Sequence, residues 1–490
     1  MKTKLVAVAA LLAGTAPAYA AISFSGAYAV AGSATDLSGF SAAQGANRLS
    51  FGSDLVYDRA TDLFYGITDR GPGGGVISYA PRVNVFRLAT DTTTNAIGGF
   101  ELVNTIMFKR DGAYFDGLNP TLLNGNPSVL GQSFDPEGIA RRANGNMLVS
   151  DEYGPSVYEF DPAGNFVRAF TTPANLVPKK PDGTTDYVAG RPDITKGRQD
   201  NRGFEGITIS PDGTKAYAIM QDPLVNEGSQ DDGRRSRNLR IVEFDIATGT
   251  ATKQVAYRLE SVDDINGRIP GTSEDFSATN QGRSIGVSSI TALADGSFLV
   301  IERDNRGLGV DDPTGANTIG TKRVYRISNI DGATDISNVS LAGANGLPNG
   351  VTAVTKTLYL DVQAALVAAG LDPNEKIEGL SFGKTLADGS LSMFLVTDND
   401  FSVTQTGQFG AQSDVCTSGE GGVSTQIAIG GVCPNGQSLI PSMIYGFRVN
   451  GADANGVMPV PEPGTWAMMI TGFGMAGTAM RRRRRTAAIA

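Results

Sequence analysis

Short runs of alternating apolar and polar residues, each interrupted by a glycine-containing turn, recur along the chain. The stretch EGITISPDGTKAYAIMQD at residues 205–222 shows the pattern clearly. Its alternating apolar positions on the two sides of the turn SPDG are Ile207, Ile209, Tyr217 and Ile219. A period of two is typical of a half-buried strand, so the stretch predicts two antiparallel strands joined by a tight turn.

This hairpin pattern is repeated five times, at residues 49–71, 137–153, 205–222, 288–307 and 378–400. A second strand pair is expected after four of the copies, at residues 83–108, 157–170, 240–259 and 323–341. After the last hairpin only MIYGFRVN, residues 443–450, has the character of a strand. The N-terminal run AISFSGAYAV, residues 21–30, could supply the missing outer strand and close a ring.

Four antiparallel strands in each of several repeats predict an all-β fold, a β-propeller over residues 21–450. Five repeats are legible, and a sixth blade could include residues 343–361, so five or six blades are expected. A jelly-roll or sandwich array is the alternative. The composition agrees with many turns, because the 490 residues include 62 Gly and 23 Pro.

Both ends of the chain have the character of targeting segments. Residues 1–20 combine two lysines, a short apolar run and small residues at Ala18 and Ala20, which predicts a cleaved secretory signal. At the other end, residues 451–463 form a linker that ends in Pro461, Glu462 and Pro463, and the uncharged run 464–480 leads to five arginines at 481–485. Residues 464–490 are therefore expected to form a short apolar anchor helix with a basic tail.

The C-terminal segment resembles the PEP-CTERM sorting signal of Gram-negative bacteria. The resemblance implies an exosortase-type protease as a partner and a transient inner-membrane anchor. It also implies a final location at the cell surface or in the extracellular matrix. An ordinary C-terminal membrane anchor is the alternative interpretation.

Charge and cysteine content narrow the functional classes. Without both lysines of the leader and the five C-terminal arginines, 34 basic residues face 50 acidic ones, a formal charge of about −16. Such a surface repels nucleic acid. The two cysteines, Cys416 and Cys433, flank a glycine-rich loop and predict one disulfide in an oxidising compartment, with a metal site as the weaker alternative.

Carboxylates recur at corresponding positions of the hairpins. Because a hairpin begins and ends at the same edge of its sheet, the glutamate that opens the first strand should lie near the acid that closes the second. The pairs are Glu137 with Asp151 and Glu152, Glu205 with Asp222, and Glu378 with Asp398 and Asp400; Asp69, Glu302 and Asp304 are expected beside them. We expect a calcium site at one mouth of the propeller, with Glu137, Asp151, Glu205, Glu378 and Asp398 as ligands.

Four arginines accompany these acids: Arg70, Arg202, Arg303 and Arg306. A guanidinium group suits phosphate or carboxylate, so a metal ion with arginines beside it predicts a site for a small anionic ester. The alternative is that these acids are turn formers, or that acid–arginine pairs tie the sheets together.

The order of DPEGI, GFEGITISPDG, ERDNRG, KIEGL and LVTDND resembles the phytase-like family named for esterase-like activity, over most of residues 45–450. The resemblance implies a relation to β-propeller phytases, which are calcium-dependent phosphomonoesterases. It identifies no catalytic residue in this chain. The Glu-Gly pairs also resemble gluconolactonase-like propellers, in which such a glutamate holds part of the metal.

The sequence GRSIG at 282–286 matches the nucleophile elbow of α/β-hydrolases. The chain contains no histidine, so a Ser-His-Asp triad is excluded. The leading hypothesis is an exported metal-dependent phosphoric ester hydrolase. The alternatives are a non-catalytic surface or matrix protein that binds polysaccharide, and a lactonase-like ester hydrolase.

Overall fold

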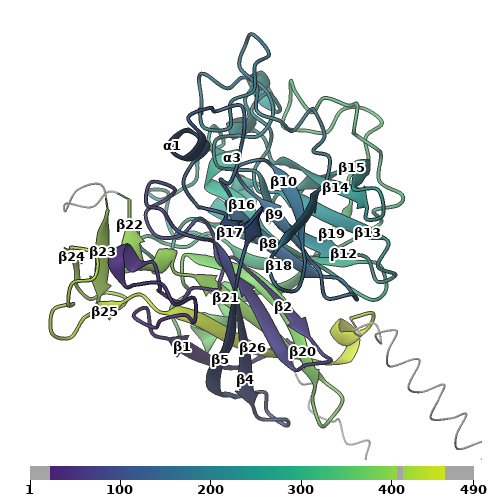
Figure 1. The fold of residues 1–490 in the computed structure, drawn as a ribbon. Coiled ribbons are helices and arrows are strands. Elements are labelled where there is room, and N and C mark those ends of the chain that lie inside the picture. Colours follow the sequence, from purple (N-terminus) through teal and green to yellow (C-terminus); the bar gives the residue numbers. More distant parts are fainter. Residues whose placement is uncertain (1–21, 406–411, 458–490) are drawn as a thin grey trace, which may run out of the picture.

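The computed structural model describes residues 22–405 and 412–457 (Figure 1). The expected secretory signal, the Pro461–Pro463 triplet and the apolar anchor lie outside the described residues. Five four-stranded antiparallel sheets form the framework of the described chain. Repeated sheets of this kind, as expected for a β-propeller, are therefore present.

The first four sheets follow the order of the chain. The first contains β2 (Asp54–Asp58), β3 (Leu63–Ile67), β4 (Arg82–Thr90) and β5 (Ile97–Met107). The second contains β8 (Pro136–Arg141), β9 (Met147–Asp151), β10 (Ser156–Phe160) and β11 (Phe166–Ala169). The third contains β12 (Phe204–Ile209), β13 (Lys215–Met220), β14 (Asn238–Asp245) and β15 (Thr250–Arg258). The fourth contains β16 (Ile285–Ala292), β17 (Phe298–Asp304), β18 (Lys322–Ser328) and β19 (Thr355–Asp361).

The fifth sheet joins the two ends of the described chain. Its strands are β20 (Lys376–Thr385), β21 (Leu391–Asp398), β26 (Ser442–Val449) and β1 (Ile22–Val30), with β1 antiparallel to β26. The N-terminal strand therefore takes the outer position that the sequence predicts for it.

One strand of the fourth sheet lies where the sequence does not predict it. The expected second strand of the pair at 323–341 is a loop, and the outer strand is β19, inside the segment considered for a sixth blade. The loop instead follows the third sheet, where the amide of Ile336 donates to the carbonyl of Gln254 at 2.8 Å. Ile336 and Leu341 are buried there against Ala256, so this apolar pattern reflects packing and not a strand.

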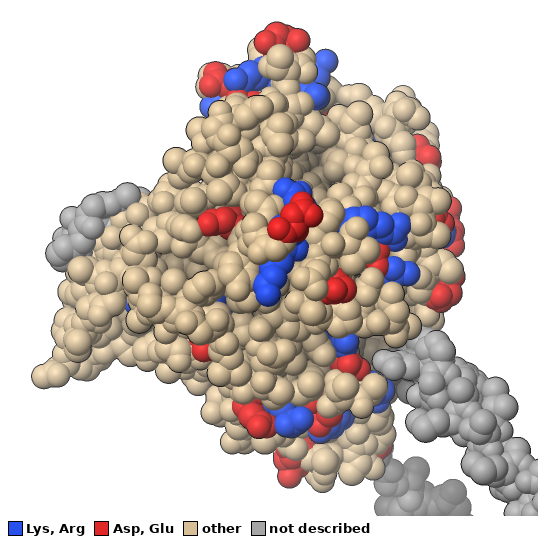
Figure 2. All heavy atoms as spheres, in the orientation of Figure 1, with Lys and Arg blue, Asp and Glu red and all other residues tan. Residues whose placement is uncertain are grey.

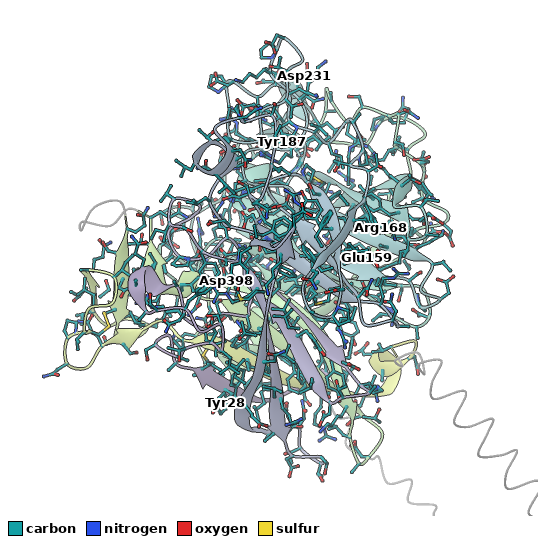
Figure 3. All side chains as sticks on the ribbon, in the orientation of Figure 1. Tyr28, Glu159, Arg168, Tyr187, Asp231 and Asp398 are labelled. Atoms are coloured by element: carbon teal, nitrogen blue, oxygen red, sulfur yellow. A yellow bond between two sulfur atoms is a disulfide. The ribbon has the colours of Figure 1, made fainter. Side chains whose placement is uncertain are left out.

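The first strands of the five sheets pack against one another in a closed order. Strand β12 lies between β8 and β16, β20 between β16 and β2, and β2 between β20 and β8. A separate apolar core fills each space between neighbouring sheets. In the space between the third and fourth sheets, for example, Ile219 packs with Val300. Figure 3 shows the side chains on this framework, with Asp398 among the labelled residues.

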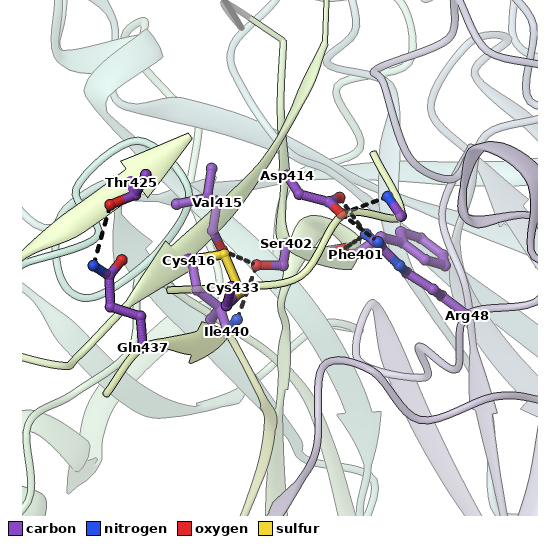
Figure 4. The surroundings of a disulfide bond; sticks show 11 residues. Arg48, Phe401, Ser402, Asp414, Val415, Cys416, Thr425, Cys433, Gln437 and Ile440 are labelled. Carbon is purple, nitrogen blue, oxygen red and sulfur yellow. Dashed lines mark hydrogen bonds and ion pairs between the residues drawn. A yellow bond between two sulfur atoms is a disulfide. The ribbon is translucent and has the colours of Figure 1, made fainter. Parts of the chain in front are cut away.

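A small lobe is inserted between β21 and β26. Its strands are β22 (Val403–Thr404), β23 (Ser413–Thr417), β24 (Ser424–Ile427) and β25 (Ser438–Leu439), which lie together at the left edge of Figure 1. Cys416 and Cys433 form the predicted disulfide inside it (Figure 4). The buried carboxylate of Asp414 accepts two hydrogen bonds of 2.6 Å from Arg48, which fixes the lobe to the segment before the first sheet.

The remaining elements are short. The helices are α1 (Pro120–Asn124), α2 (Val262–Asn266), α3 (Gln281–Ser284) and α4 (Val362–Ala368), and β6 (Lys109–Arg110) pairs with β7 (Ala113–Tyr114). The 3-10 turns are η1 (Ala43–Gly45), η2 (Ser229–Asp231), η3 (Gly233–Arg235), η4 (Asp400–Ser402) and η5 (Gly451–Ala454). Within residues 22–405 and 412–457, no helix has the length and apolar character needed to span a membrane. Ser284 precedes a strand and so lacks the strand-to-helix turn of a nucleophile elbow.

Candidate functional site

The three Glu-Gly pairs occupy the same structural position in three sheets. In β8, β12 and β20 the pairing register shifts at the glutamate, which is the extra residue of a β-bulge: Glu137, Glu205 and Glu378. A bulge redirects the side chain locally, which is why bulges are frequent beside functional sites. In β16 the corresponding bulge residue is Ser288.

The glycine that follows each glutamate is required by close strand packing. A Cβ atom on Gly138 would lie 2.8 Å from the Cα of Gly206, and one on Gly206 would lie 2.9 Å from the Cα of Ser289. On Gly379 it would approach the backbone of Leu55 at 3.0 Å. Neighbouring first strands thus touch backbone to backbone at these positions.

The three glutamates open into one cavity of about 310 Å³, which we call the acidic cavity. Its acidic lining residues are Asp69, Glu137, Glu152, Glu205, Asp311, Glu375, Glu378, Asp398 and Asp400. Its basic lining residues are Arg70, Arg202, Arg303 and Lys376, and its neutral ones are Asn201, Gln221, Asn305, Val310, Val403 and Gln405. All five sheets or the loops that leave them contribute, together with the small lobe.

Arg303 joins the fourth sheet to two of the glutamates. Its Nη2 donates to Oε1 of Glu378 and lies 3.8 Å from Oε1 of Glu205. Its Nε donates to Ser288 at 2.8 Å and its Nη1 to Asn305 at 2.8 Å, so the guanidinium group is held firmly. The Oε2 atoms of both glutamates are buried and have no hydrogen-bond partner among the described residues.

Two other arginines reach the cavity from loops. Arg202 donates to Gln221 at 2.6 Å, and Gln221 in turn donates to Oε1 of Glu205 at 2.5 Å. Arg70 lies 3.2 Å from Asp135 and also donates to Asn201. Each of these arginines keeps further N–H groups for an anion.

Lys376 pairs with two other acids that line the cavity. Its ammonium group lies 2.5 Å from Asp400 and 3.4 Å from Asp398. Asp69 faces the same aspartates from the first sheet, and one oxygen each of Asp69, Asp398 and Asp400 lies within 4.8 Å of the others. A second group with the same spacing consists of Asp69, Asp135 and Glu137.

Burial and mutual repulsion raise the pKa of most of these acids. Burial, followed by the charge of Glu378, raises the pKa of Glu205 to about 8. Burial and the charge of Asp400 raise the pKa of Glu375 to about 8. The pKa of Asp398 rises to about 7, chiefly through burial. Burial and neighbouring carboxylates also hold the pKa values of Asp69 and Glu137 well above the usual range.

A hard cation fits this set of residues. Carboxylate oxygens are the ligands that calcium prefers, and buried carboxylate oxygens without a partner carry a desolvation cost that a cation would remove. Glu205, Glu378 and Glu375 each have such an atom. The positive charges of Arg303 and Lys376 only partly balance the nearby acids.

The predicted residues fall into two groups. Glu137, Glu205, Glu378 and Asp398 line the acidic cavity, as do Arg70, Arg202 and Arg303. Asp151 lies elsewhere, because its carboxylate accepts backbone hydrogen bonds from Asp135, Tyr153 and Gly154 at 3.0, 3.2 and 2.9 Å. Arg306 also lies outside the cavity, stacked over Phe276 at 3.8 Å and donating to the carbonyls of Glu274 and Thr318.

Two further acids that were expected at the mouth support the sheets instead. Glu302 accepts hydrogen bonds from Tyr257 at 2.5 Å and from the amide of Glu260 at 3.0 Å. Asp304 binds Lys322 at 2.8 Å. Asp222 is not among the cavity's lining residues; it is buried, with Arg202 at 3.5 Å.

Several site residues were not singled out by the repeat pattern: Asp135, Asn201, Gln221, Asp311, Glu375 and Lys376. Of these, Glu375 directly precedes strand β20, which contains a Glu-Gly pair, and Lys376 is the first residue of that strand, so their positions could have been a signal. Asn201 and Asp311 lie in irregular loops, where the repeat gives no position.

Charge on the face of the molecule shown in Figure 2 is distributed differently from charge in the acidic cavity. On the face shown in Figure 2, acidic and basic side chains lie in small mixed groups separated by uncharged surface. The acidic cavity is thus a local concentration of carboxylates.

Comparison with known proteins agrees with the sequence motifs. The family model described as phytase-like, esterase-like activity of phytase, matches residues 48–401, and the PEP-CTERM protein-sorting motif matches residues 459–485. The sorting motif indicates export to the cell surface. An uncharacterized secreted protein of Arthroderma benhamiae is 33% identical over 230 residues, which cover 44% of this chain and 42% of the relative. The chain thus spans less than half the length of that relative.

Similarity to solved structures is weak. A putative 6-phosphogluconolactonase from Bacteroides uniformis is 13% identical, with 86% of this chain and 98% of that chain covered and a TM-score of 0.29. The Dos1 propeller is 9% identical, with 81% and 67% covered and a TM-score of 0.25. These scores assign neither fold nor function. The match over residues 48–401 does assign a family: the chain belongs to the phytase-like family described by esterase-like activity of phytase.

Proposed function

We propose that this chain is an exported, metal-dependent hydrolase of phosphoric esters that acts at the acidic cavity, and that its five sheets are the blades of a five-bladed propeller. One observation carries the functional proposal. Buried carboxylate oxygens without partners lie in one cavity with three arginines, at the end of the ring where the first strands begin. Family membership supports the same reaction class.

Calcium is the proposed cation, and the cavity's carboxylates would hold it. Asp69, Glu137 and Asp398 belong to the two groups whose oxygens lie within 4.8 Å of one another, and Glu205 and Glu378 would add buried oxygens that have no partner among the described residues. When bound, calcium supplies a Lewis acid for a phosphoryl oxygen. The arginines bind and orient the ester's remaining anionic oxygens. Because Arg303 is fixed by Ser288 and Asn305, it presents its charge at a defined place without reorganisation.

Carboxyl groups in the cavity can also exchange protons near neutral pH. In the metal-free protein, burial and the charge of Asp400 raise the pKa of Glu375 to about 8, so this side chain is largely protonated at neutral pH. A group poised in this way can donate a proton to a leaving alkoxide. We assign Glu375 this role as part of the proposal.

The proposed cellular route follows from the sorting motif. An exosortase-type protease would recognise the Pro461–Pro463 triplet of an inner-membrane-anchored intermediate, and the body would then reach the cell surface or matrix of a Gram-negative bacterium.

A lactonase-like esterase would use the same cavity, so the assay must separate the two reactions. The full chain is stripped of metal and assayed for phosphate release from p-nitrophenyl phosphate and for opening of δ-gluconolactone, with and without calcium. We expect phosphate release only with calcium. Lactone opening without phosphate release would overturn the phosphoric ester proposal, as would a lack of activity on both substrates.

Matched variants connect the activity with the cavity. Glu205→Gln and Glu378→Gln remove charge but keep shape, and each should weaken calcium binding in calorimetric titration and lower kcat/KM by at least about tenfold. Glu243→Gln is the control, because Glu243 lies in the third sheet and pairs with Lys215 at 3.0 Å, outside the cavity. Unchanged calcium affinity in both cavity variants would contradict the metal site.

A further inference from the structure

A second pocket, separate from the acidic cavity, lies beside the first sheet. Its volume is about 290 Å³, and it shares no lining residue with the acidic cavity. Four aromatic side chains line it: Phe40, Tyr79, Tyr114 and Phe115. The other lining residues are Ala46, Ser78, Ala80, Arg82 and Asp116. We call it the aromatic pocket.

Arg82 brings an unsatisfied donor to this pocket. The side chain is fully buried, and its Nη1 donates to Asp36 at 2.5 Å while its Nε donates to the carbonyl of Ala80 at 2.8 Å. Its guanidinium group lies over the ring of Tyr79 at 4.2 Å. Its Nη2 has no hydrogen-bond partner among the described residues. A buried donor without a partner is costly, so an acceptor supplied by a ligand would be favoured there.

Asp116 offers the pocket a hydrogen-bond acceptor. Its Oδ1 accepts from the amides of Tyr79 and Leu118 at 3.3 and 2.9 Å, and its Oδ2 accepts from the hydroxyl of Ser78 at 2.5 Å. A carboxylate oxygen can accept more than one hydrogen bond, so Oδ2 has capacity for a donor from a ligand. The pocket therefore offers a donor and an acceptor between aromatic surfaces.

Tyr114 makes the aromatic surface accessible. The residue is 45% exposed, although its ring contacts Phe40 edge-on with a centroid distance of 5.8 Å. The ammonium group of Lys109 lies 5.2 Å from the centre of the same ring, so the part of the ring that neither Lys109 nor Phe40 covers is the apolar surface open to a ligand.

We propose that the aromatic pocket binds an uncharged saccharide ring. The C–H face of a pyranose packs on aromatic rings, and its hydroxyl groups both accept from Arg82 and donate to Asp116. An anionic ligand is disfavoured, because Asp36 already compensates the charge of Arg82 and Asp116 repels a second anion. A purely apolar ligand would cover Nη2 without satisfying it.

Affinity electrophoresis of the full chain in gels that contain soluble neutral polysaccharides tests this proposal. The probes are an α-glucan, a β-glucan, a galactomannan and a xylan, each compared with a gel without polysaccharide. We expect retardation by at least one probe. Tyr114→Ala should weaken the apparent affinity at least about fivefold, because stacking on the exposed ring is lost.

Tyr187→Ala is the matched control, because this partly buried tyrosine does not line the aromatic pocket. It should bind as the wild type does. A milder variant, Ser78→Ala, leaves the rings intact and frees Asp116, so it should retain binding. Absence of retardation by all four probes would overturn the proposal, as would equal retardation of Tyr114→Ala and the wild type. Glu205→Gln should not change the retardation, which separates this site from the acidic cavity.

Discussion

At the scale of single residues, the acidic cavity is costly for the folded protein without a cation. Glu205, Glu375 and Asp398 have pKa values of about 8, 8 and 7, raised chiefly by burial and further by neighbouring carboxylates. A group with a raised pKa binds protons more tightly in the folded state than in the unfolded one. Folding stability is therefore lost as pH rises from the unfolded value near 4.5 towards 8.

We predict that the melting temperature of the metal-free protein falls between pH 5 and pH 8. Calcium should raise it more at pH 8 than at pH 5, by roughly 5 °C, because protons and calcium compete for the same oxygens. Differential scanning fluorimetry at both pH values measures the effect. An equal calcium effect at the two pH values would count against carboxylate ligation.

Glu205→Gln is the control for this pH dependence. Because it removes one titrating group, the melting temperature of this variant should fall less steeply between pH 5 and pH 8. Acids whose pKa is lowered in the fold do not interfere. Asp58, hydrogen-bonded to Arg141, and Glu159, hydrogen-bonded to Asn146 and two arginines, titrate below this window despite partial burial. Asp54 does not line the cavity, but burial, with a smaller contribution from the charge of Glu378, raises its pKa to about 8. Its contribution to the dependence of melting temperature on pH therefore remains in Glu205→Gln.

The sequence predicts only some of the residues that line the acidic cavity. Glu137, Glu205 and Glu378 could be found because the same Glu-Gly pair recurs near the start of the first strand in three of the hairpins. Asp151 follows the same hairpin logic, yet its carboxylate binds three backbone amides. The pattern fixes the edge of the sheet at which a side chain lies; it does not fix whether the carboxylate meets a cavity or a turn.

At the scale of elements, the glycine after each glutamate determines how closely the first strands approach. Gly206 of β12 faces the backbone of Ser289 and Ile290 in β16. The positions of strands can be predicted from the alternation of apolar and polar residues. The contact between Gly206 and β16 joins residues about 80 positions apart, so no local sequence pattern predicts it. The loop at 329–354 is a second example, since its apolar residues pack on the third sheet without forming a strand.

We predict that Gly206→Ala destabilises the protein by about 1–3 kcal/mol, because its Cβ would lie 2.9 Å from both Ile290 N and Ser289 Cα. Backbone atoms cannot move aside as a flexible side chain can. Chemical denaturation monitored by circular dichroism gives the difference in free energy of unfolding.

Gly98→Ala is the matched control for this substitution. Gly98 lies in the outer strand β5, and a Cβ there would only contact the carbonyl of Ala89 at 3.6 Å. This variant should be neutral or slightly more stable. If Gly206→Ala and Gly98→Ala have the same free energy of unfolding, Gly206 is not needed for the close packing of the first strands.

At the scale of the whole molecule, the ring is closed by strands from opposite ends of the chain. Strand β1 pairs with β26, and the apolar core between the first and fifth sheets joins Leu55 to Val396. The order of repeats in the sequence predicts this closure, because the last hairpin lacks an outer strand. The small lobe is not predictable from the repeat, since it interrupts the fifth sheet between β21 and β26.

The described chain ends in contact with the body. Val457 is buried in the core between the fourth and fifth sheets, and the amide of Asp295 donates to the carbonyl of Gly456 at 3.1 Å. Arg326 donates to the carbonyl of Asn455 at 3.1 Å. All the strands of the five sheets that residues 22–405 and 412–457 form lie before this point.

We therefore predict that a chain truncated after Val457 unfolds with the same midpoint as the full chain, within about 2 °C, and in one cooperative transition. Its location in cells should change, because the sorting motif at 459–485 has been removed. Calorimetry measures the first effect, and fractionation with an antibody against the body measures the second. Truncation after Val449 is the matched comparison: it keeps all strands but removes Val457 from its core, and should lower the midpoint by several degrees. A large loss of stability on truncation after Val457 would mean that the folded body extends into the tail.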